Sequence, residues 1–117
     1  MKDIFQSDMQ RIIQESVPGK QITIAHVIAS PDPDICERLG TDGCGALGIV
    51  TISPFEAAII AADVATKAAQ VEIGFLDRFT GSLTVYGDVQ SVETALNSIN
   101  EVLTSTLGFI GTRVTKT

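Results

Sequence analysis

Residues 46–69 read ALGIVTISPFEAAIIAADVATKAA, and this stretch decides the fold. Its first part, residues 46–52, is apolar and rich in β-branched side chains, which predicts a strand. The next four residues, Ser53-Pro54-Phe55-Glu56, form a capping box with proline at the first helical position. They predict a helix over residues 54–69. Because this helix is mostly Ala and Ile, it is suited to close packing against other backbone.

The sequence beyond this helix predicts a hairpin and a second helix. Residues 71–77 and 82–87 have the pattern of strands, and the four residues between them fit a tight antiparallel connection. Asp88 is placed to cap the next helix and Gly108 to end it. Apolar residues repeat at helical spacing between these two positions: Val89, Val92, Leu96, Ile99, Leu103 and Leu107. The tail from Phe109 onward is expected to add one more strand.

The sequence before residue 46 adds a strand and a short helix. Residues 20–28 are rich in β-branched side chains and have an alternating pattern, which predicts a strand. Four residues are expected on one side of it: Ile22, Ile24, His26 and Ile28. Residues 33–39 predict a helix with Asp32 as its cap and Gly40 as its stop, and with Ile35, Cys36 and Leu39 on one face. The order from residue 46 contains the split β-α-β arrangement of ferredoxin-like domains, so we expect an α+β fold.

Composition limits the classes of protein to consider. The chain has 117 residues, the size of one domain, and its hydrophobic content of 44% includes few aromatics. A slightly positive mean hydropathy indicates apolar surface kept for self-association. The net charge of -6 provides no basic surface for nucleic acid. The apolar runs are far shorter than the roughly 20 residues that span a bilayer, so we expect a cytoplasmic protein with no membrane partner.

No motif indicates catalysis, a metal site or a cofactor. His26, the sole histidine, shares its predicted face with isoleucines, which favours a hydrogen-bonded structural role. Cys36 and Cys44 lack CxxC spacing and are interpreted as reduced, packed thiols, although an enzyme would need one of them as nucleophile. The glycines of residues 43–48 partly match a dinucleotide motif, but they precede a strand where that motif requires them to follow one.

Several stretches of the chain resemble the shell proteins of bacterial microcompartments, in the same order and over roughly residues 11–117. The matching stretches are RIIQE (11–15), VPGKQITIAH (17–26), ALGIVT (46–51), EAA (56–58), AADVATKAA (61–69), VEIGFLDRFTG (71–81) and YGDV (86–89). They are similar to the circularly permuted branch known from ethanolamine- and propanediol-utilisation compartments. That branch moves the closing strand and helix to the front, which implies a permuted ferredoxin-like domain over residues 20–117 and an extension over residues 1–19.

The resemblance implies a structural shell subunit and not an enzyme. Such subunits form cyclic homohexamers that tile into the shell in the bacterial cytoplasm. They need no cofactor, and their implied partners are other shell proteins and encapsulated enzymes. Ethanolamine, propanediol and choline compartments all use similar subunits. From the residues alone, the alternative is a ferredoxin-like oligomer that binds a small ligand or has a regulatory role, with residues 43–48 holding the ligand at a subunit interface.

The resemblance also gives several residues a place in the hexamer. Lys67 is expected at the hexamer edge, with its stem along a neighbouring hexamer. Thr80, Gly81 and Ser82 are expected to form the pore loop around the sixfold axis. The extension is expected to supply one strand of a six-chain parallel β-barrel that caps the pore, formed by Gln10, Arg11, Ile12, Ile13, Gln14, Glu15 and Ser16. Residues 1–8 are expected to be disordered.

The residues themselves leave alternatives open. The extension also fits an amphipathic helix that docks a cargo enzyme, through Ile4, Phe5, Met9, Ile12, Ile13 and Val17. Without the resemblance, Lys67 fits a solvated helix residue and residues 80–82 fit a plain tight turn. Gly45 is a candidate hinge between the front elements and the rest of the domain, and a hinge there would allow bent or twisted hexamers as well as flat ones.

Overall fold

The computed structural model describes residues 19–117. The predicted barrel strand, residues 10–16, and the segment 1–8 therefore lie outside the described residues. The elements in chain order are β1 (Gln21–Ala29), α2 (Pro33–Leu39), β2 (Ala46–Ser53), α3 (Ala57–Ala68), β3 (Glu72–Asp77), β4 (Ser82–Gly87), α4 (Val89–Leu107) and β5 (Thr115–Lys116). The predicted α+β class is confirmed. None of the helices described in residues 19–117 is long and apolar enough to cross a membrane.

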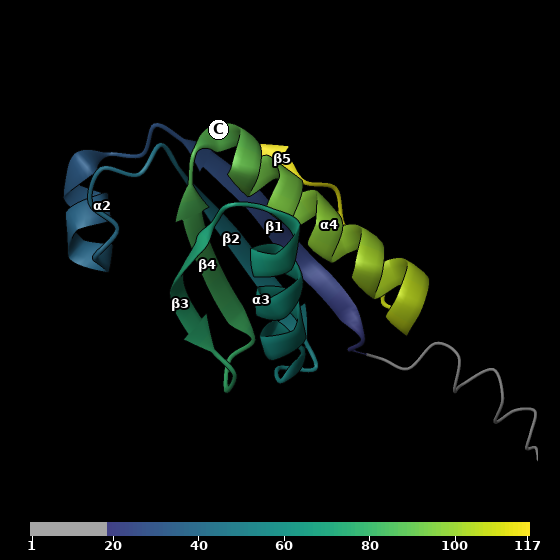
Figure 1. The fold of residues 1–117 in the computed structure, drawn as a ribbon. Helices are drawn as coiled ribbons and strands as arrows, with labels where there is room; N and C mark the ends of the chain where they lie inside the picture. The colour runs from purple at the N-terminus through teal and green to yellow at the C-terminus, as the bar shows by residue number, and fades with distance from the viewer. Residues whose placement is uncertain (1–18) are drawn as a thin grey trace, which may run out of the picture.

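The strands form a single sheet in the order β3-β4-β2-β1-β5, and α3 and α4 cover one face of it (Figure 1). All neighbouring strands are antiparallel except β5, which runs parallel to β1. From β2 onward the elements follow the ferredoxin-like order of strand, helix, strand, strand, helix. The remaining strand of that arrangement is β1, which pairs with β2 although it comes first in the chain.

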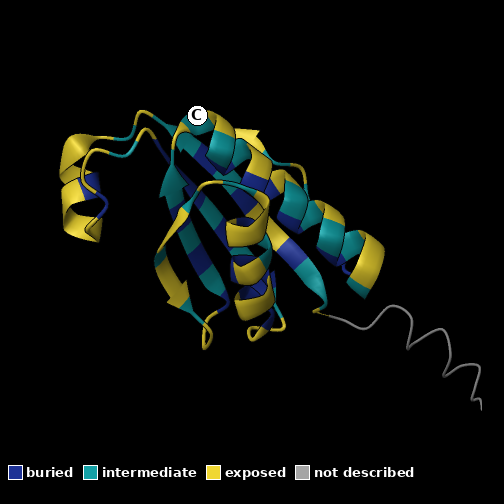
Figure 2. Ribbon diagram, in the orientation of Figure 1, coloured by how far each residue is buried: buried dark blue, intermediate teal, exposed yellow. Residues whose placement is uncertain are grey.

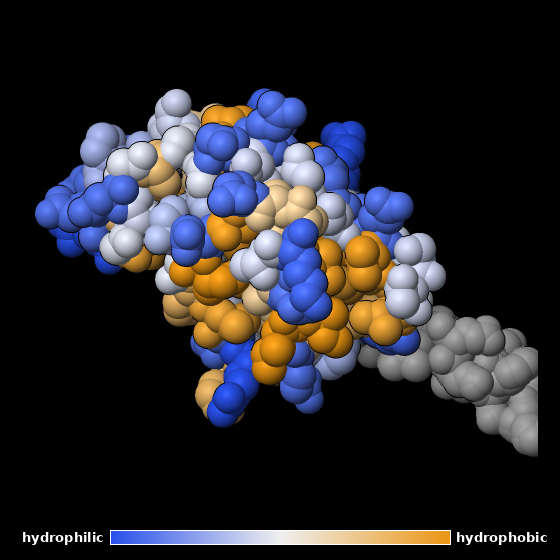
Figure 3. Space-filling view, in the orientation of Figure 1, coloured by the Kyte–Doolittle hydropathy of each residue, from blue (hydrophilic) through white to orange (hydrophobic). Residues whose placement is uncertain are grey.

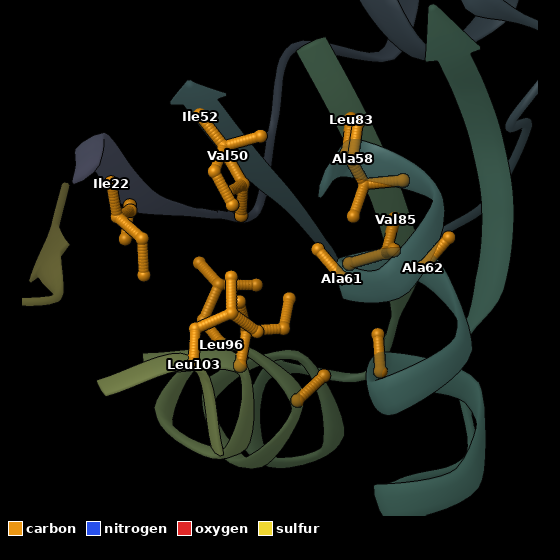
Figure 4. Packing of buried hydrophobic residues seen from close by; sticks show 14 of the residues in the cluster. Ile22, Val50, Ile52, Ala58, Ala61, Ala62, Leu83, Val85, Leu96 and Leu103 are labelled. Carbon is orange, nitrogen blue, oxygen red and sulfur yellow. The ribbon is translucent and has the colours of Figure 1, made fainter. Parts of the chain in front are cut away.

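The core lies between the sheet and the two long helices. In Figure 4, Val50 and Val85 from the sheet lie opposite α3 and α4, which contribute small alanines and larger leucines respectively. Gly48 allows α4 to lie close to β2, because a Cβ there would be 2.8 Å from a methyl of Leu96. Since alanines fill the α3 side, this helix also lies close to the sheet, as its composition predicts.

The start of α3 differs from the predicted capping box. The helix begins at Ala57, and Ser53 is the last residue of β2, where it pairs with Gln21 of β1. Glu56 occupies the N-cap position without a side-chain hydrogen bond. The first-turn amides bond to backbone carbonyls instead, and the Ala57 N–H donates to the Pro54 carbonyl at 2.9 Å. The capping-box prediction is wrong because strand pairing holds Ser53 in the sheet.

A β-bulge in β1 changes which side chains face the core. The pairing with β2 shifts register between Ile22 and Ile24. Ile22 is buried, Ile24 is 48% exposed, and the next core residues are Ala25 and Val27. A bulge adds one residue, so it reverses the alternation beyond it. The predicted common face is therefore wrong for Ile22, and the other three residues of that set share the open face: Ile24, His26 and Ile28.

The caps of α2 and α4 lie where the sequence predicts them. The Asp32 side chain accepts a hydrogen bond from a first-turn amide of α2, and Gly40 ends this helix in the left-handed conformation. The predicted apolar face of α2 is only partly buried: Cys36 is buried, whereas Ile35 and Leu39 remain about half exposed. Most of α2 is coloured as exposed in Figure 2. The short helix therefore leaves apolar side chains in solvent.

The Asp88 cap of α4 makes stability depend on pH. Asp88 accepts hydrogen bonds from the Ser91 backbone N–H (2.8 Å) and hydroxyl (3.2 Å), which hold its pKa below its ordinary value. A lowered folded pKa means that this contribution is present above about pH 4 and is lost as pH falls through the folded pKa. We expect Asp88→Ala to lower the melting temperature by several degrees at pH 7.

The matched variant for this cap is Asp88→Asn, because asparagine caps helices about as well as aspartate but does not titrate. Thermal unfolding from pH 7 to pH 2 should give a wild-type melting temperature that falls more steeply below pH 4 than that of Asp88→Asn. Parallel curves for the two proteins would contradict the assignment of pH dependence to this carboxylate.

Candidate functional site

The turn between β3 and β4, residues 78–81, is held by hydrogen bonds to the two residues that flank it, Asp77 and Ser82. The Phe79 N–H donates to the Asp77 carboxylate and the Gly81 N–H donates to the Asp77 carbonyl, each at 2.9 Å. The bond from Phe79 is also the main reason that the pKa of Asp77 lies below its ordinary value. The Thr80 hydroxyl donates a hydrogen bond to the Ser82 hydroxyl at 3.2 Å. The candidate pore loop is therefore an ordered tight turn.

Gly81 ties this turn to the end of β2. Its carbonyl accepts a hydrogen bond from the Ile52 N–H at 2.9 Å. Its φ is +77°, and a Cβ at this position would overlap the Ile52 carbonyl oxygen. Both the conformation and the close backbone contact require glycine. The turn is therefore fixed next to the segment that enters α3.

Apolar surface lies on both sides of α3 (Figure 3). On the β3 side, Ile59, Leu76 and Phe79 line a depression of about 390 Å³ together with Asp77 and Arg78. On this side Phe79 is 73% exposed, which is unusual for a phenylalanine in a small monomer.

The α4 side of the helix carries a second depression, of about 340 Å³. Ile60, Leu107 and Phe109 line it, with Lys20 and other residues around them. Ile59 and Ile60 are adjacent in the sequence and point to the two sides of α3, and each is more than two-fifths exposed. We call these two surfaces the α3 flanks. A positive mean hydropathy predicts such surface but not its location. The local signal for it is the pair of adjacent isoleucines, Ile59 and Ile60, within an alanine-rich helix.

Lys67 lies on the last turn of α3 and points into solvent. Its Nζ is 3.0 Å from an Asp63 carboxylate oxygen, and the lysine side chain is 76% exposed. An exposed pair of this kind contributes little to stability. Lys67 and Thr80–Ser82 are near opposite ends of α3, because the turn contacts Ile52 just before the helix. The rise from Ala57 to Lys67 is roughly 15 Å.

Residues 30–45, here called the α2 excursion, leave the sheet between β1 and β2 and carry α2 to one side of it (Figure 1). The excursion is closed at its base by a hydrogen bond from the Ser30 N–H to the Gly45 carbonyl, at 2.9 Å. Gly45 does not have a positive φ in this conformation, whereas Gly40 and Gly43 do, at +76° and +77°. The candidate hinge residue thus lies at the base of the excursion, and the left-handed glycines lie within it.

The residues considered for catalysis lie in different elements, His26 in β1 and the two cysteines in the α2 excursion. His26 joins β5 to the sheet, with its Nδ1 2.6 Å from the Thr115 hydroxyl and its Nε2 2.9 Å from that of Thr117. Cys36 and Cys44 contact each other and are free thiols. Within residues 19–117, no group of three or more His, Cys, Asp or Glu side chains is arranged to hold a metal ion.

Within the glycine-rich run 43–48, Gly48 serves packing and Gly45 approaches the backbone at the start of α4, which leaves Gly43 as the one glycine of the run with no atom near its Cβ position. Gly48 is buried in β2 beneath Val92 and Leu96 of α4. Gly45 lies at the base of the α2 excursion, next to the backbone of Asp88. The ligand-binding alternative is therefore not favoured.

The BMC domain family matches residues 46–116 of the chain. The chain is 57% identical over 108 residues to the bacterial microcompartment shell protein CutR of Streptococcus intermedius, covering 92% of this chain and 93% of CutR. It is 50% identical over 113 residues to the shell protein PduU of Salmonella typhimurium, covering 96% and 97%. The shell protein EutS of Escherichia coli is 50% identical over 109 residues, covering 93% and 98%.

Solved structures of CutR are similar to the whole described fold. A flat CutR hexamer matches with a TM-score of 0.82 at 57% identity, covering 92% of this chain and 99% of that one. A CutR screw with a 41.9 Å pitch matches with a TM-score of 0.82 at 54% identity, covering 86% and 100%. A domain-swapped CutR dimer matches with a TM-score of 0.65 at 54% identity, covering 85% and 100%.

Proposed function

The chain belongs to the BMC-domain family of bacterial microcompartment shell proteins, and on this premise we propose that it forms cyclic homohexamers that tile into a shell. It is a structural shell subunit and not an enzyme. The observation that carries the hexamer is the similarity, over nearly the whole chain, to CutR subunits in a flat hexamer. We place the protein in the microcompartment shell, in the bacterial cytoplasm, with other shell proteins as its neighbours.

The α3 flanks support a ring made by head-to-tail contacts. A cyclic hexamer needs two different surfaces on each subunit, because one surface of a subunit meets the other surface of the next. The flank with Ile59 and Phe79 and the flank with Ile60 and Phe109 are such a pair of distinct apolar surfaces. Covering both would remove from water most of the exposed apolar area around α3.

We infer that Thr80, Gly81 and Ser82 surround the sixfold axis and that Lys67 lies at the outer edge. Two observations support this arrangement: the turn is an ordered, glycine-containing loop, and it lies near the end of α3 opposite to Lys67. A helix of this length separates an axial loop from a peripheral lysine within one subunit. The Lys67 stem would then lie along the neighbouring hexamer.

We also propose that the domain is circularly permuted and that its extension caps the pore. The family match starts at Ala46, with β1 and α2 outside it, and β1 completes the ferredoxin-like sheet from the front of the chain. Residues 10–16 of each subunit would give one strand to a six-chain parallel barrel on the axis. A capped axis would make this subunit restrict passage, or present a docking surface to encapsulated enzymes.

The base of the α2 excursion supports Gly45 as a hinge between the front elements and the rest of the domain. In the part of the chain that the structure describes, two segments cross there, and a hydrogen bond from the Ser30 N–H to the Gly45 carbonyl joins them. CutR has been solved as a flat hexamer, a screw and a domain-swapped dimer. A rotation at Gly45 would give this chain comparable variation in form.

Native mass spectrometry and electron microscopy of the full chain test these proposals together. We expect a hexamer mass and extended sheets, with residues 80–82 on the axis, Lys67 between hexamers and residues 10–16 in an axial barrel. A monodisperse monomer that forms no sheets would contradict the shell proposal. An open axis with residues 10–16 splayed outward would contradict only the cap, and uniformly flat sheets with one excursion conformation would contradict the hinge.

We expect Lys67→Ala to abolish extended sheets while leaving hexamers intact. The variant removes the proposed contact between hexamers but touches neither α3 flank. Its matched control is Arg38→Ala on α2, because Arg38 is also an exposed cation paired with an acidic residue four positions earlier. Electron microscopy should show sheets for Arg38→Ala and separate hexamers for Lys67→Ala. Normal sheets from both variants would remove Lys67 from the proposed edge.

A further inference from the structure

Cys36 and Cys44 face each other inside the α2 excursion, with their sulfur atoms 3.4 Å apart. Cys36 is in the middle of α2 and Cys44 is in the loop that returns to β2. A disulfide requires a sulfur–sulfur distance of about 2.05 Å. We propose that these two thiols are a reversible oxidation site, which forms an intramolecular disulfide when the folded protein reacts with a low-molecular-weight disulfide such as glutathione disulfide.

Thr41 holds the two cysteines in this arrangement. Its backbone N–H and its hydroxyl both donate to the Cys36 carbonyl, at 2.8 Å and 3.3 Å. Its own carbonyl accepts from the Cys44 N–H at 3.2 Å, and its hydroxyl lies 3.7 Å from the Cys44 sulfur, within reach of a thiol hydrogen bond. Thr41 is itself almost fully buried, with 1% exposure. The backbone on both sides of the sulfur pair is therefore fixed, and closing the bond needs only a small side-chain movement.

Different exposure gives the two thiols different roles in the reaction. Cys44 is half-buried, whereas Cys36 is 3% exposed, and burial raises the pKa of the Cys36 thiol. The Cys44 thiolate is therefore expected to react first. It attacks one sulfur of glutathione disulfide, which forms a mixed disulfide and releases one glutathione thiolate.

Cys36 completes the exchange because no other thiol lies so near. Its sulfur, after losing a proton to water, attacks the Cys44 sulfur and breaks the mixed disulfide. A second glutathione thiolate leaves, so two protein thiols are oxidised and one glutathione disulfide is reduced to two thiols. The new bond would join the middle of α2 to the residue beside Gly45, and so tie the excursion to its own base.

The experiment is mass spectrometry of the folded full-length chain after incubation with glutathione disulfide and acid quenching. We expect the wild type to lose the mass of two hydrogen atoms, and tryptic peptides to show Cys36 joined to Cys44. In Cys36→Ser, the mixed disulfide on Cys44 should persist, because the second thiol is missing. In Cys44→Ser, modification should be slower by on the order of 100-fold, because Cys36 is buried with a raised pKa.

Two further measurements complete the test: the rate of thiol alkylation and the presence of disulfide-linked dimers. After oxidation, the rate at which the wild-type thiols are alkylated should fall by on the order of 100-fold, and it should return to its starting value on treatment with a dithiol reductant. A stable glutathione adduct on the wild type would overturn the proposal, as would disulfide-linked dimers or an unreacted protein. The wild-type measurement requires no variant to fold, and it does not depend on whether the chain is a hexamer.

Discussion

Replacing Ile59 with aspartate is expected to convert the proposed hexamer into monomers. Ile59 is 48% exposed and borders the apolar depression with Leu76 and Phe79. Burying such a side chain in an interface contributes about 1.5–3 kcal/mol, and placing an unpaired carboxylate there adds a desolvation penalty. A loss of about 3 kcal/mol weakens each subunit contact by roughly 100-fold. Native mass spectrometry at micromolar concentration should therefore show the monomer as the main species.

Ile35→Asp is the matched control, since Ile35 is also a helical isoleucine and is 49% exposed. It lies on α2, away from both α3 flanks, so this variant should retain the hexamer mass. Both variants change exposed positions, so their far-ultraviolet circular dichroism should match the wild type. If Ile59→Asp remains a hexamer while folded, the β3 side of α3 is not a subunit interface.

Local chemistry made the helix caps of this chain predictable. Asp32 and Asp88 accept first-turn amides, and Gly40 and Gly108 adopt the left-handed conformation, all through contacts within a few residues. Ser53 has the same local signature, but its backbone pairs with Gln21, more than thirty positions earlier. Long-range pairing overrides capping there, and a single sequence gives no local sign of it.

The bulge in β1 was unpredictable for a similar reason. Beyond Ile24 both alternating sets of β1 contain apolar residues, so the sequence does not decide which set faces the core. The shift after Ile22 is visible only in the register with β2. The contact of Cys36 with Cys44 likewise depends on how Thr41 folds the loop between them. Spacing alone favoured two unrelated thiols. Periodicity predicts which elements form, whereas pairing and loop closure decide which side chains meet.

The candidate site depended on a different source of information. Lys67 and Thr80–Ser82 have ordinary local patterns, a solvated helix residue and a tight turn, and only the family resemblance gives them a place in an assembly. The structure adds that they lie near opposite ends of α3 and that the turn is pinned by Asp77 and Ile52. The α3 flanks could not be located from composition, because surface exposure depends on the tertiary packing of α3 between β3 and α4.

Gly81→Ala is expected to destabilise the fold by about 2–3 kcal/mol. A residue with a Cβ at φ +77° costs roughly 1–2 kcal/mol in backbone strain. The Cβ also overlaps the Ile52 carbonyl oxygen, so the backbone must move and weaken the hydrogen bond from the Ile52 N–H to the Gly81 carbonyl. Losing that bond adds about 1 kcal/mol. Chemical denaturation, read as the free energy of unfolding at a fixed protein concentration, measures the sum.

Gly43→Ala separates the two causes, because Gly43 has the same φ of +77° but no atom within 4 Å of its Cβ position. It should lose only the strain, roughly 1–2 kcal/mol. The difference of about 1 kcal/mol between the variants then measures the contact of the turn with β2. Equal losses would mean that the turn moves away from Ile52 at little cost. A loop that yields so easily could not hold six copies of Thr80–Ser82 in fixed positions around an axis, so this comparison also tests whether the turn is rigid enough for its proposed place in the pore.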